Sequence, residues 1–354
     1  MGFISLISTL LLPLIAVGCS DSAGPAAEDS ALTPWPVTAF PALPEVTSDV
    51  PEARIELGRL LFFDPILSGD HQTACATCHS ELWGMGDGIS RSIGQGAGLD
   101  AGPGREGPNM LRRNSPSLFN VAFRPSLLWD GRETLLEEQA LGPLFADDEL
   151  GADREALLSE LTDIPEYVSR FEDAFPEDPR VTIENLTSAL AAYERTFVAD
   201  RTTYDAYVGG RSNLMNDDEI EGMYRFAEMG CDNCHIPPLF GSETFANRNV
   251  PEVEGIVDLG LEEVTGREED RGKFRAMSLR NLLSTEPYFH NGSIPTMRMA
   301  IRHELEQSGL PFTDEDLLLI ELFIDNTLRD ETHKAIRPTS VPSGLHLPID
   351  PAGP

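Results

Sequence analysis

The sequence predicts a mainly α-helical protein with two domains. Its 354 residues suit two ordinary domains better than one. Several segments repeat apolar residues at helical spacing, and no alternating strand pattern of any length occurs. One motif, Cys-x-x-Cys-His, occurs in each half of the chain, as CATCH at 75–79 and as CDNCH at 231–235. We therefore expect two helical domains with related chemistry.

The repeated motif indicates what each domain binds. Cys-x-x-Cys-His is the attachment signature of c-type haem, in which both thiols bind the porphyrin and the histidine lies under the iron. The residues concerned are Cys75, Cys78 and His79 in the first copy and Cys231, Cys234 and His235 in the second. The predicted fold is therefore mainly α, with two cytochrome c-like domains that each carry one covalently bound c-type haem.

Other uses of paired cysteines fit the sequence less well. The chain has five cysteines, and the two motifs account for all of them except Cys19. A thioredoxin-like redox pair would use the Cys-x-x-Cys spacing once and would not need an adjacent histidine twice. Two zinc knuckles would each lack a cysteine as fourth ligand, and a single zinc site shared by all four motif cysteines would leave both histidines unexplained.

Apolar periodicity places helices throughout both expected domains. The N-terminal domain is expected over 51–208 and the C-terminal domain over 209–335, with a Gly-Gly pair at the junction. A Pro-rich tail follows at 336–354, and residues 84–108 form a long glycine-rich loop near the first motif. The expected helices span 51–64, 132–141, 153–161, 164–174, 181–197, 216–230 and 311–328.

The N-terminus predicts export. Residues 1–18 hold an apolar run that is shorter than a bilayer span and ends in small residues. Cys19 then stands where a bacterial lipoprotein carries its lipidated cysteine, which makes it a candidate lipid anchor. Residues 19–50 are rich in Pro, Ala and acids, as in a tether. We expect a periplasmic protein. If Cys19 is lipidated, it attaches the protein to a bacterial membrane.

The charge of the chain excludes one class of partner. Acidic residues outnumber basic ones by 59 to 26, which gives a formal net charge of −33. Such a polyanion is repelled by nucleic acid, so neither DNA nor RNA is an expected partner. The acids either form a docking face for a basic protein or simply solvate the surface, and their even spread along the chain locates no patch.

A series of sequence blocks then points to a family. Over residues 51–335 the chain resembles the bacterial dihaem cytochrome c peroxidases and their MauG relatives. The resemblance rests on blocks in the same order, which are LGRLLFFDPILSGD, CATCH, SIGQG, RRNSPSLFN, LLWDGRETLLEEQALGP, DDELG, the second motif, GKFRAMSLRN and EPYFHNGS.

This resemblance implies different roles for the two haems. The N-terminal haem, with His79 as its proximal ligand, would react with hydrogen peroxide. The C-terminal haem, with His235 as its ligand, would supply electrons from a small cytochrome c or copper protein. Trp129 stands where the family has a tryptophan between the haems, and Gln139 and Glu149 stand at its distal-pocket positions.

The resemblance also implies a calcium ion and an oligomer. The calcium site between the domains would use Asn114 and the carbonyls of Thr285 and Pro287. Homodimers are common in the family, although no interface stripe is visible in this sequence.

Physical chemistry supports the distal roles. Heterolytic cleavage of the O–O bond of peroxide requires a group that moves a proton from the oxygen nearer the iron to the departing oxygen. A carboxylate such as Glu149 can do this if a poorly solvated pocket raises its pKa towards neutrality. The amide of Gln139 can donate a hydrogen bond to the peroxide.

One departure from the family lies in the SIGQG loop. Well-known members present a histidine there, which caps the N-terminal iron until the other haem is reduced. This chain has Gln95, and an amide is a poor ligand for haem iron. We therefore expect an N-terminal haem that is five-coordinate or water-bound when oxidised and needs no reductive activation. His71, in a nearby turn, is the weaker alternative as a capping ligand.

The second departure concerns the sixth ligand of the C-terminal haem. The family supplies a methionine or a tyrosine fourteen residues after the histidine of YFHxG. That position is Glu304 in this chain, so we favour its neighbour His303, which would give a bis-histidine haem of low potential. Met299 and Met277 are the alternatives.

Three functions follow from these expectations. The first is a peroxidase that reduces hydrogen peroxide to water with electrons from a small redox protein. The second is a MauG-like enzyme that oxidises residues of a partner protein. The third is a dihaem electron shuttle without catalysis, which the open iron expected beside Gln95 argues against.

Overall fold

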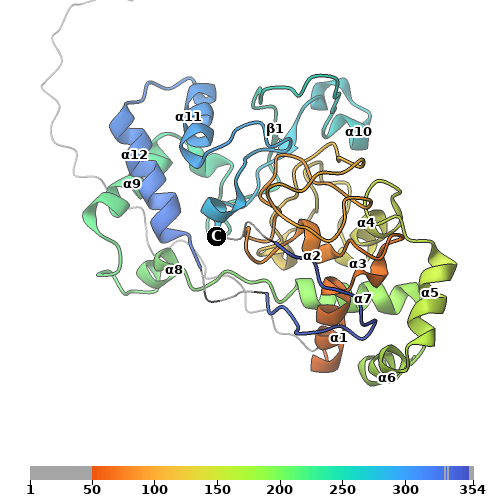
Figure 1. Cartoon of the computed structure of the whole chain (residues 1–354). Coiled ribbons are helices and arrows are strands. Elements are labelled where there is room, and N and C mark those ends of the chain that lie inside the picture. Colours follow the sequence, from red (N-terminus) through yellow and green to blue (C-terminus); the bar gives the residue numbers. More distant parts are fainter. Residues whose placement is uncertain (1–49, 331, 333–334, 351–354) are drawn as a thin grey trace, which may run out of the picture. The chain divides into compact units, whose positions relative to one another are not determined.

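The chain is mainly helical, as the sequence predicts. The computed structural model describes residues 50–330, 332 and 335–350 (Figure 1). The expected export signal at 1–18 and all but the last residue of the tether at 19–50 lie outside the described residues. Within the described ranges, no helix is both long enough and apolar enough to cross a membrane.

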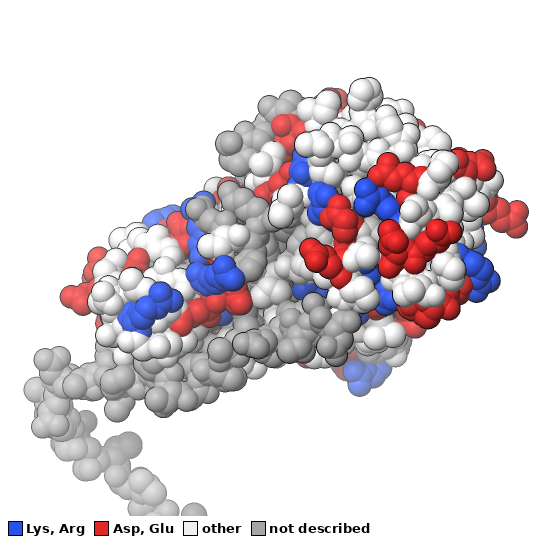
Figure 2. Space-filling model, turned by 90° about the horizontal axis from the view of Figure 1, so that it is seen from below, with Lys and Arg blue, Asp and Glu red and all other residues white. Residues whose placement is uncertain are grey.

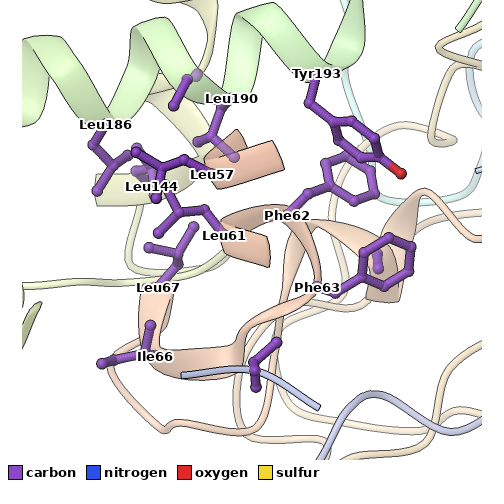
Figure 3. Packing of buried hydrophobic residues seen from close by; sticks show 14 of the residues in the cluster. Leu57, Leu61, Phe62, Phe63, Ile66, Leu67, Leu144, Leu186, Leu190 and Tyr193 are labelled. Carbon is purple, nitrogen blue, oxygen red and sulfur yellow. The ribbon is translucent and has the colours of Figure 1, made fainter. Parts of the chain in front are cut away.

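Two helices form the centre of a first helical group. α1 (Glu52–Phe63) follows Pro51, and α7 (Ile183–Glu194) starts at Thr182, whose side chain accepts a hydrogen bond from the backbone of Asn185. The apolar faces of the two helices pack together, and Figure 3 shows the side chains that meet. They include Leu57, Leu61, Phe62, Leu186, Leu190 and Tyr193. This burial gives the first half of the chain its core.

A second helical group contains α9 (Asp217–Glu228), α11 (Met297–Ser308) and α12 (Asp314–Leu322), with α11 and α9 packed beside α12 (Figure 1). α9 begins with a capping box at Asn216. α12 begins with one at Thr313. After Leu322 the backbone continues as a π-helical turn.

Each group has a glycine where its two main helices cross. A Cβ atom at Gly58 in α1 would overlap the carbonyl oxygen of Ala189 in α7. A Cβ atom at Gly222 in α9 would in the same way overlap the carbonyl oxygen of Leu319 in α12. The missing side chain therefore lets the helix backbones touch, and the two halves of the chain solve the same packing problem alike.

The remaining predicted helices differ in extent. The single helix expected over 132–141 is wrong, because the chain forms two short helices, α3 (Leu136–Gln139) and α4 (Leu141–Phe145). Pro143 has no N–H to donate to the carbonyl of Gln139, which explains the break. The other elements are α2 (Cys75–Cys78), α5 (Arg154–Asp163), α6 (Pro165–Ala174), α8 (Thr203–Val208), α10 (Glu262–Thr265) and the antiparallel pair β1 (Phe245–Ala246) and β2 (Phe274–Arg275).

The glycine-rich loop at 84–108 is ordered by one buried arginine. The Arg105 guanidinium donates hydrogen bonds to the carbonyls of Ile93 at 3.0 Å, Gly94 at 3.0 Å and Gly98 at 2.9 Å. The Asp70 carboxylate accepts a hydrogen bond from the Gly96 backbone at 2.7 Å. These contacts hold the SIGQG segment in place although it contains no helix or strand.

The tail after residue 335 packs on the first helical group. Val341 is buried in that core. Arg337 donates to the Glu81 carboxylate at 2.6 Å, and Ser343 donates to Asp64 at 2.7 Å. The tail therefore covers the end of α1 as part of the fold.

Acidic side chains are not concentrated at one place on the visible face. Figure 2 shows Asp and Glu side chains in several groups with Lys and Arg side chains between them. Ion pairs such as Arg112 with Glu263, at 2.6 Å, connect charges of both signs. This view therefore does not locate an acidic docking face.

We predict that Gly58→Ala lowers the free energy of unfolding by about 1–3 kcal/mol, because the added methyl group forces α1 away from α7. Chemical denaturation of the haem-loaded protein measures this. The control is Gly142→Ala in α4, where the added Cβ has nothing within 4 Å. That change should be neutral or should stabilise by about 0.4–1 kcal/mol. Equal effects of the two substitutions would contradict the prediction.

Candidate active site

The first motif lines a small cavity. Cys75 and Cys78 lie on α2, and His79 ends that helix, so all three residues line one space of about 80 Å³. The His79 Nδ1 lies 2.9 Å from the carbonyl oxygen of Met85 and 3.2 Å from the Ser115 hydroxyl. Nδ1 must carry the proton to donate to the carbonyl, which leaves Nε2 free to bind a metal. Burial lowers the pKa of His79 and favours this neutral form.

The second motif lines a larger cavity of about 810 Å³. Cys231, Cys234 and His235 all border this space. The His235 Nδ1 lies 3.1 Å from the carbonyl oxygen of Phe240 and 3.0 Å from that of Met277. Both motif histidines are therefore oriented in the same way, by main-chain carbonyls on the far side of the ring from Nε2.

The residues around both cavities fit a covalently attached haem. The four motif cysteines are free thiols that line the same spaces as the two histidines. Each histidine keeps one ring nitrogen for an iron. Over the described ranges, no group of three or more His, Cys, Asp or Glu side chains is arranged to hold a metal ion.

The structure brings both expected distal residues to the first cavity. Gln139, the last residue of α3, and Glu149, in the turn after α4, line it together with His79. Burial raises the pKa of Glu149, and the neighbouring Asp148 raises it further, against an opposing effect of Arg132. A carboxyl group in this environment can exchange a proton nearer to neutral pH than an exposed one.

Gln95 is not among the residues that line the cavity. Its side-chain Nε2 donates to the carbonyl of Asp147 at 2.8 Å, and its backbone N–H donates to that of Glu149 at 2.7 Å. Gly94 borders the cavity in its place. Gln95 thus ties the glycine-rich loop to the turn that carries Glu149. His71 pairs with Glu160 at 2.9 Å and also lies outside the cavity lining.

Trp129 borders the second cavity. Its indole Nε1 donates to the carbonyl of Asn114 at 2.9 Å, and its ring centroid lies 6.5 Å from that of His290. His290 in turn stacks on Phe274 with centroids 3.6 Å apart. Trp129 is therefore held between the RNSP segment and the wall of the second cavity.

The residues expected to bind calcium lie on segments that approach each other. The backbone N–H of Asn114 donates to the carbonyl of His290 at 2.7 Å, and its side-chain amide donates to that of Ile89 at 2.9 Å. Thr285 ends a short turn that contacts Gly84. Pro287 follows a cis peptide bond. The calcium site stays a prediction.

His303, the favoured sixth ligand, does not line the second cavity. Its Nε2 lies 2.8 Å from the carbonyl oxygen of Arg248, and its ring packs edge-on against Phe289. Glu304 does line the cavity, with its carboxylate held by the Arg248 Nε at 2.7 Å. The helical turn of α11 explains the difference, because adjacent residues point about 100° apart.

The two methionine alternatives are also placed unfavourably. Met299 is 51% exposed and lies outside the lining. Met277 borders the cavity, but its carbonyl binds the Nδ1 of His235, so this residue lies on the histidine side of the site.

One residue in the first cavity was missed from the sequence. Glu194 at the end of α7 lines the cavity and is 7% exposed. Its Oε2 has no hydrogen-bond partner among the described residues, and burial raises its pKa to about 8. A signal existed, because Glu194 follows Leu190 by four residues and so shares the apolar face of the helix.

Comparison with known proteins identifies the family. The family model described as di-haem cytochrome c peroxidase matches residues 52–213. A cytochrome c551 peroxidase of Nitrosomonas europaea is 35% identical over 248 residues, which cover 70% of this chain and 71% of that protein. A cytochrome c551 peroxidase of Pseudomonas aeruginosa is 34% identical over 305 residues, which cover 83% and 85%.

A solved structure agrees with this assignment. A MauG-like protein associated with microbial copper homeostasis has a TM-score of 0.70 at 26% identity, with 88% of this chain and 98% of that chain covered. Its likeness extends the match beyond the segment of the family model, to both halves of the described chain. The protein is therefore an oxidoreductase that belongs to the di-haem cytochrome c peroxidase family.

Proposed function

We propose that this protein is a peroxidase that reduces hydrogen peroxide to water at its N-terminal haem. The observation that carries the proposal is the meeting of Glu149, Gln139 and His79 around one cavity. Two cytochrome c-like domains, over 51–208 and 209–335, would each hold one c-type haem. Electrons would come from a small cytochrome c or copper protein and enter at the C-terminal haem.

The residues of the first cavity have distinct parts in this reaction. One molecule of hydrogen peroxide takes up two electrons and two protons and yields two molecules of water. Cys75, Cys78 and His79 would hold the haem, which would supply the iron and the electrons. Glu149 accepts the proton from one peroxide oxygen and returns it to the other, so that the departing oxygen leaves as water. Gln139 donates a hydrogen bond that orients the peroxide.

The surroundings of the protein are part of the proposal. An exported chain in the periplasm, with Cys19 as its lipid anchor, would meet small redox proteins there. A calcium ion at Asn114, Thr285 and Pro287 would join the segment that holds Asn114 to the segment that holds Thr285 and Pro287. A homodimer is compatible with these roles, and they do not require one.

We also propose Glu304 as the side chain that faces the C-terminal iron in place of His303. The support is its position in the cavity lining and the ion pair that holds it to Arg248. An anionic oxygen near the iron favours the oxidised state, which suits a haem of low potential.

A MauG-like function is the second candidate. The solved MauG-like structure, and a Gln95 that leaves the first cavity unblocked, favour it. Glu149 and Gln139 serve either reaction, because both begin with peroxide. Steady-state turnover separates them, since an enzyme that oxidises a partner protein should use reduced cytochrome c only slowly.

We predict that Glu149→Gln lowers peroxide turnover about 10²–10⁴-fold, because the amide cannot relay a proton. Oxidation of reduced cytochrome c measures the rate, and haem content is checked in parallel. The wild-type rate should also fall as the pH drops below the raised pKa of Glu149, because the protonated carboxyl cannot accept a proton. The variant should lack this dependence. Glu138→Gln, at the exposed neighbour of Gln139, should keep full activity, and equal losses in both variants would refute the assignment.

We predict that the fully oxidised protein reacts with stoichiometric peroxide without prior reduction. Electron paramagnetic resonance of the oxidised protein should show a high-spin signal from the N-terminal haem. Gln95→Ala should preserve this signal, because the amide binds Asp147 and does not line the cavity. A spectrum with low-spin signals alone would contradict the hypothesis that the N-terminal iron is five-coordinate or water-bound.

We predict that Glu304→Gln raises the midpoint potential of the C-terminal haem and alters its optical spectrum. Loss of the negative charge disfavours the oxidised iron, which explains the direction. His303→Ala should leave both properties unchanged. Spectroelectrochemical titration measures the potential, and the reverse pattern would restore His303 as the ligand.

A further inference from the structure

A short run of hydrogen bonds and main chain connects the two cavities. It begins at His79, the histidine of the first motif, and ends at Trp129, which borders the second cavity. Between them lie only Ser115 and Asn114, which are neighbours in the chain. Both are buried, each with 8% of its surface exposed.

The serine hydroxyl makes the first link. The Ser115 Oγ lies 3.2 Å from the His79 Nδ1 and donates to the carbonyl of Cys78 at 2.7 Å. One hydroxyl therefore contacts the histidine and also the residue that provides the second thiol of the same motif. The backbone of Ser115 is joined to that of Asn114 by the peptide bond between them.

The indole makes the second link. The carbonyl of Asn114 accepts a hydrogen bond from the Trp129 Nε1 at 2.9 Å. The covalent part of the route runs from the Asn114 carbonyl through its peptide bond to the Cα and Cβ of Ser115. The rest of the route consists of two hydrogen bonds, one between His79 and Ser115 and one between Trp129 and Asn114.

Each member of the route is held by contacts outside it. His79 donates to Met85, Asn114 donates through its backbone to His290, and the Trp129 carbonyl accepts from the Arg275 backbone at 2.9 Å. A contiguous set of packed and hydrogen-bonded groups of this kind can carry coupling between distant sites. A side chain on this route can change its partner only by breaking a buried hydrogen bond.

We propose that Ser115 is a positioning residue that couples the two haems electronically, through Asn114 and Trp129. The direction from the C-terminal to the N-terminal haem rests on the proposed function. In each transfer one electron leaves one haem, which is oxidised, and reaches the other, which is reduced. No bond breaks and no proton is released. The same route serves both directions, so either can be used to test it.

The aromatic contacts beyond Trp129 extend the route on one side. Trp129 lies against His290, which stacks on Phe274, and all three residues line the second cavity. These rings would border the second haem, whereas the link towards His79 runs through the indole Nε1 of Trp129. Ser115 is therefore the narrow point of the connection, where a single atom can be removed.

The test uses the full haem-loaded protein without peroxide. Pulse radiolysis injects one electron, and its relaxation between the haems is followed optically. The midpoint potentials of both haems are measured in each variant, and the rates are compared after correction for driving force. Ser115→Ala should slow the relaxation several-fold, and Ser115→Thr, which keeps the hydroxyl, should restore it.

Ser117→Ala is the matched control. The Ser117 hydroxyl donates to the carbonyl of Gly84 at 2.7 Å, and this bond involves neither His79 nor Trp129. This variant should relax at the wild-type rate. A Ser115→Ala rate equal to wild type, or an equal slowing in Ser117→Ala, would overturn the proposal.

A double variant asks whether the residues act in series. Trp129→Phe removes the indole N–H, so adding Ser115→Ala to it should slow the relaxation no further. Additive slowing would place Ser115 on a separate route and overturn the proposal. Because no peroxide is present, a protein that proves inert to peroxide would refute the proposed function but leave this measurement intact. An active peroxidase with an unchanged Ser115→Ala rate would refute the coupling alone.

Discussion

In both halves of the described chain, the motif histidine donates from Nδ1 to main-chain carbonyls. Met85 accepts this bond from His79, and Phe240 and Met277 accept it from His235. The bond selects the tautomer, aims Nε2 into the cavity and increases the basicity of the ring as a ligand. The carbonyls come from loops, so the folding of those loops decides whether each site can hold an iron at all.

The packing of the helices positions these loops. A glycine at the crossing of α1 with α7, and another at the crossing of α9 with α12, let the backbones touch. Apolar side chains of these helices line part of each cavity, such as Leu190 of α7 in the first and Phe226 of α9 in the second. Arg105 then orders the glycine-rich loop by donating to its carbonyls, and Gln95 joins that loop to the turn of Glu149. The distal pocket is thus built from three separate parts of the sequence.

Burial of polar groups distinguishes the two cavities. The first contains two carboxyl groups, Glu149 and Glu194, whose pKa values are raised by loss of solvent. The second contains a carboxylate, Glu304, that an arginine keeps paired. A raised pKa suits a carboxyl group to proton exchange near neutral pH, whereas an ion pair fixes the position of a carboxylate. The two cavities thus differ in how their carboxyl groups are held.

Local chemistry made much of this predictable from the sequence. The Cys-x-x-Cys-His spacing indicates the cofactor, and helical periodicity located α1, α7, α9 and α12, because each of these depends on neighbours in the chain. The lining of the cavities depends on contacts between distant segments. A difference of one residue on α11 separates His303 from Glu304, and a spacing of four on α7 brings Glu194 inside. Ser115 meets His79 across thirty-six positions of sequence, which only the packing of the loops against the helices decides.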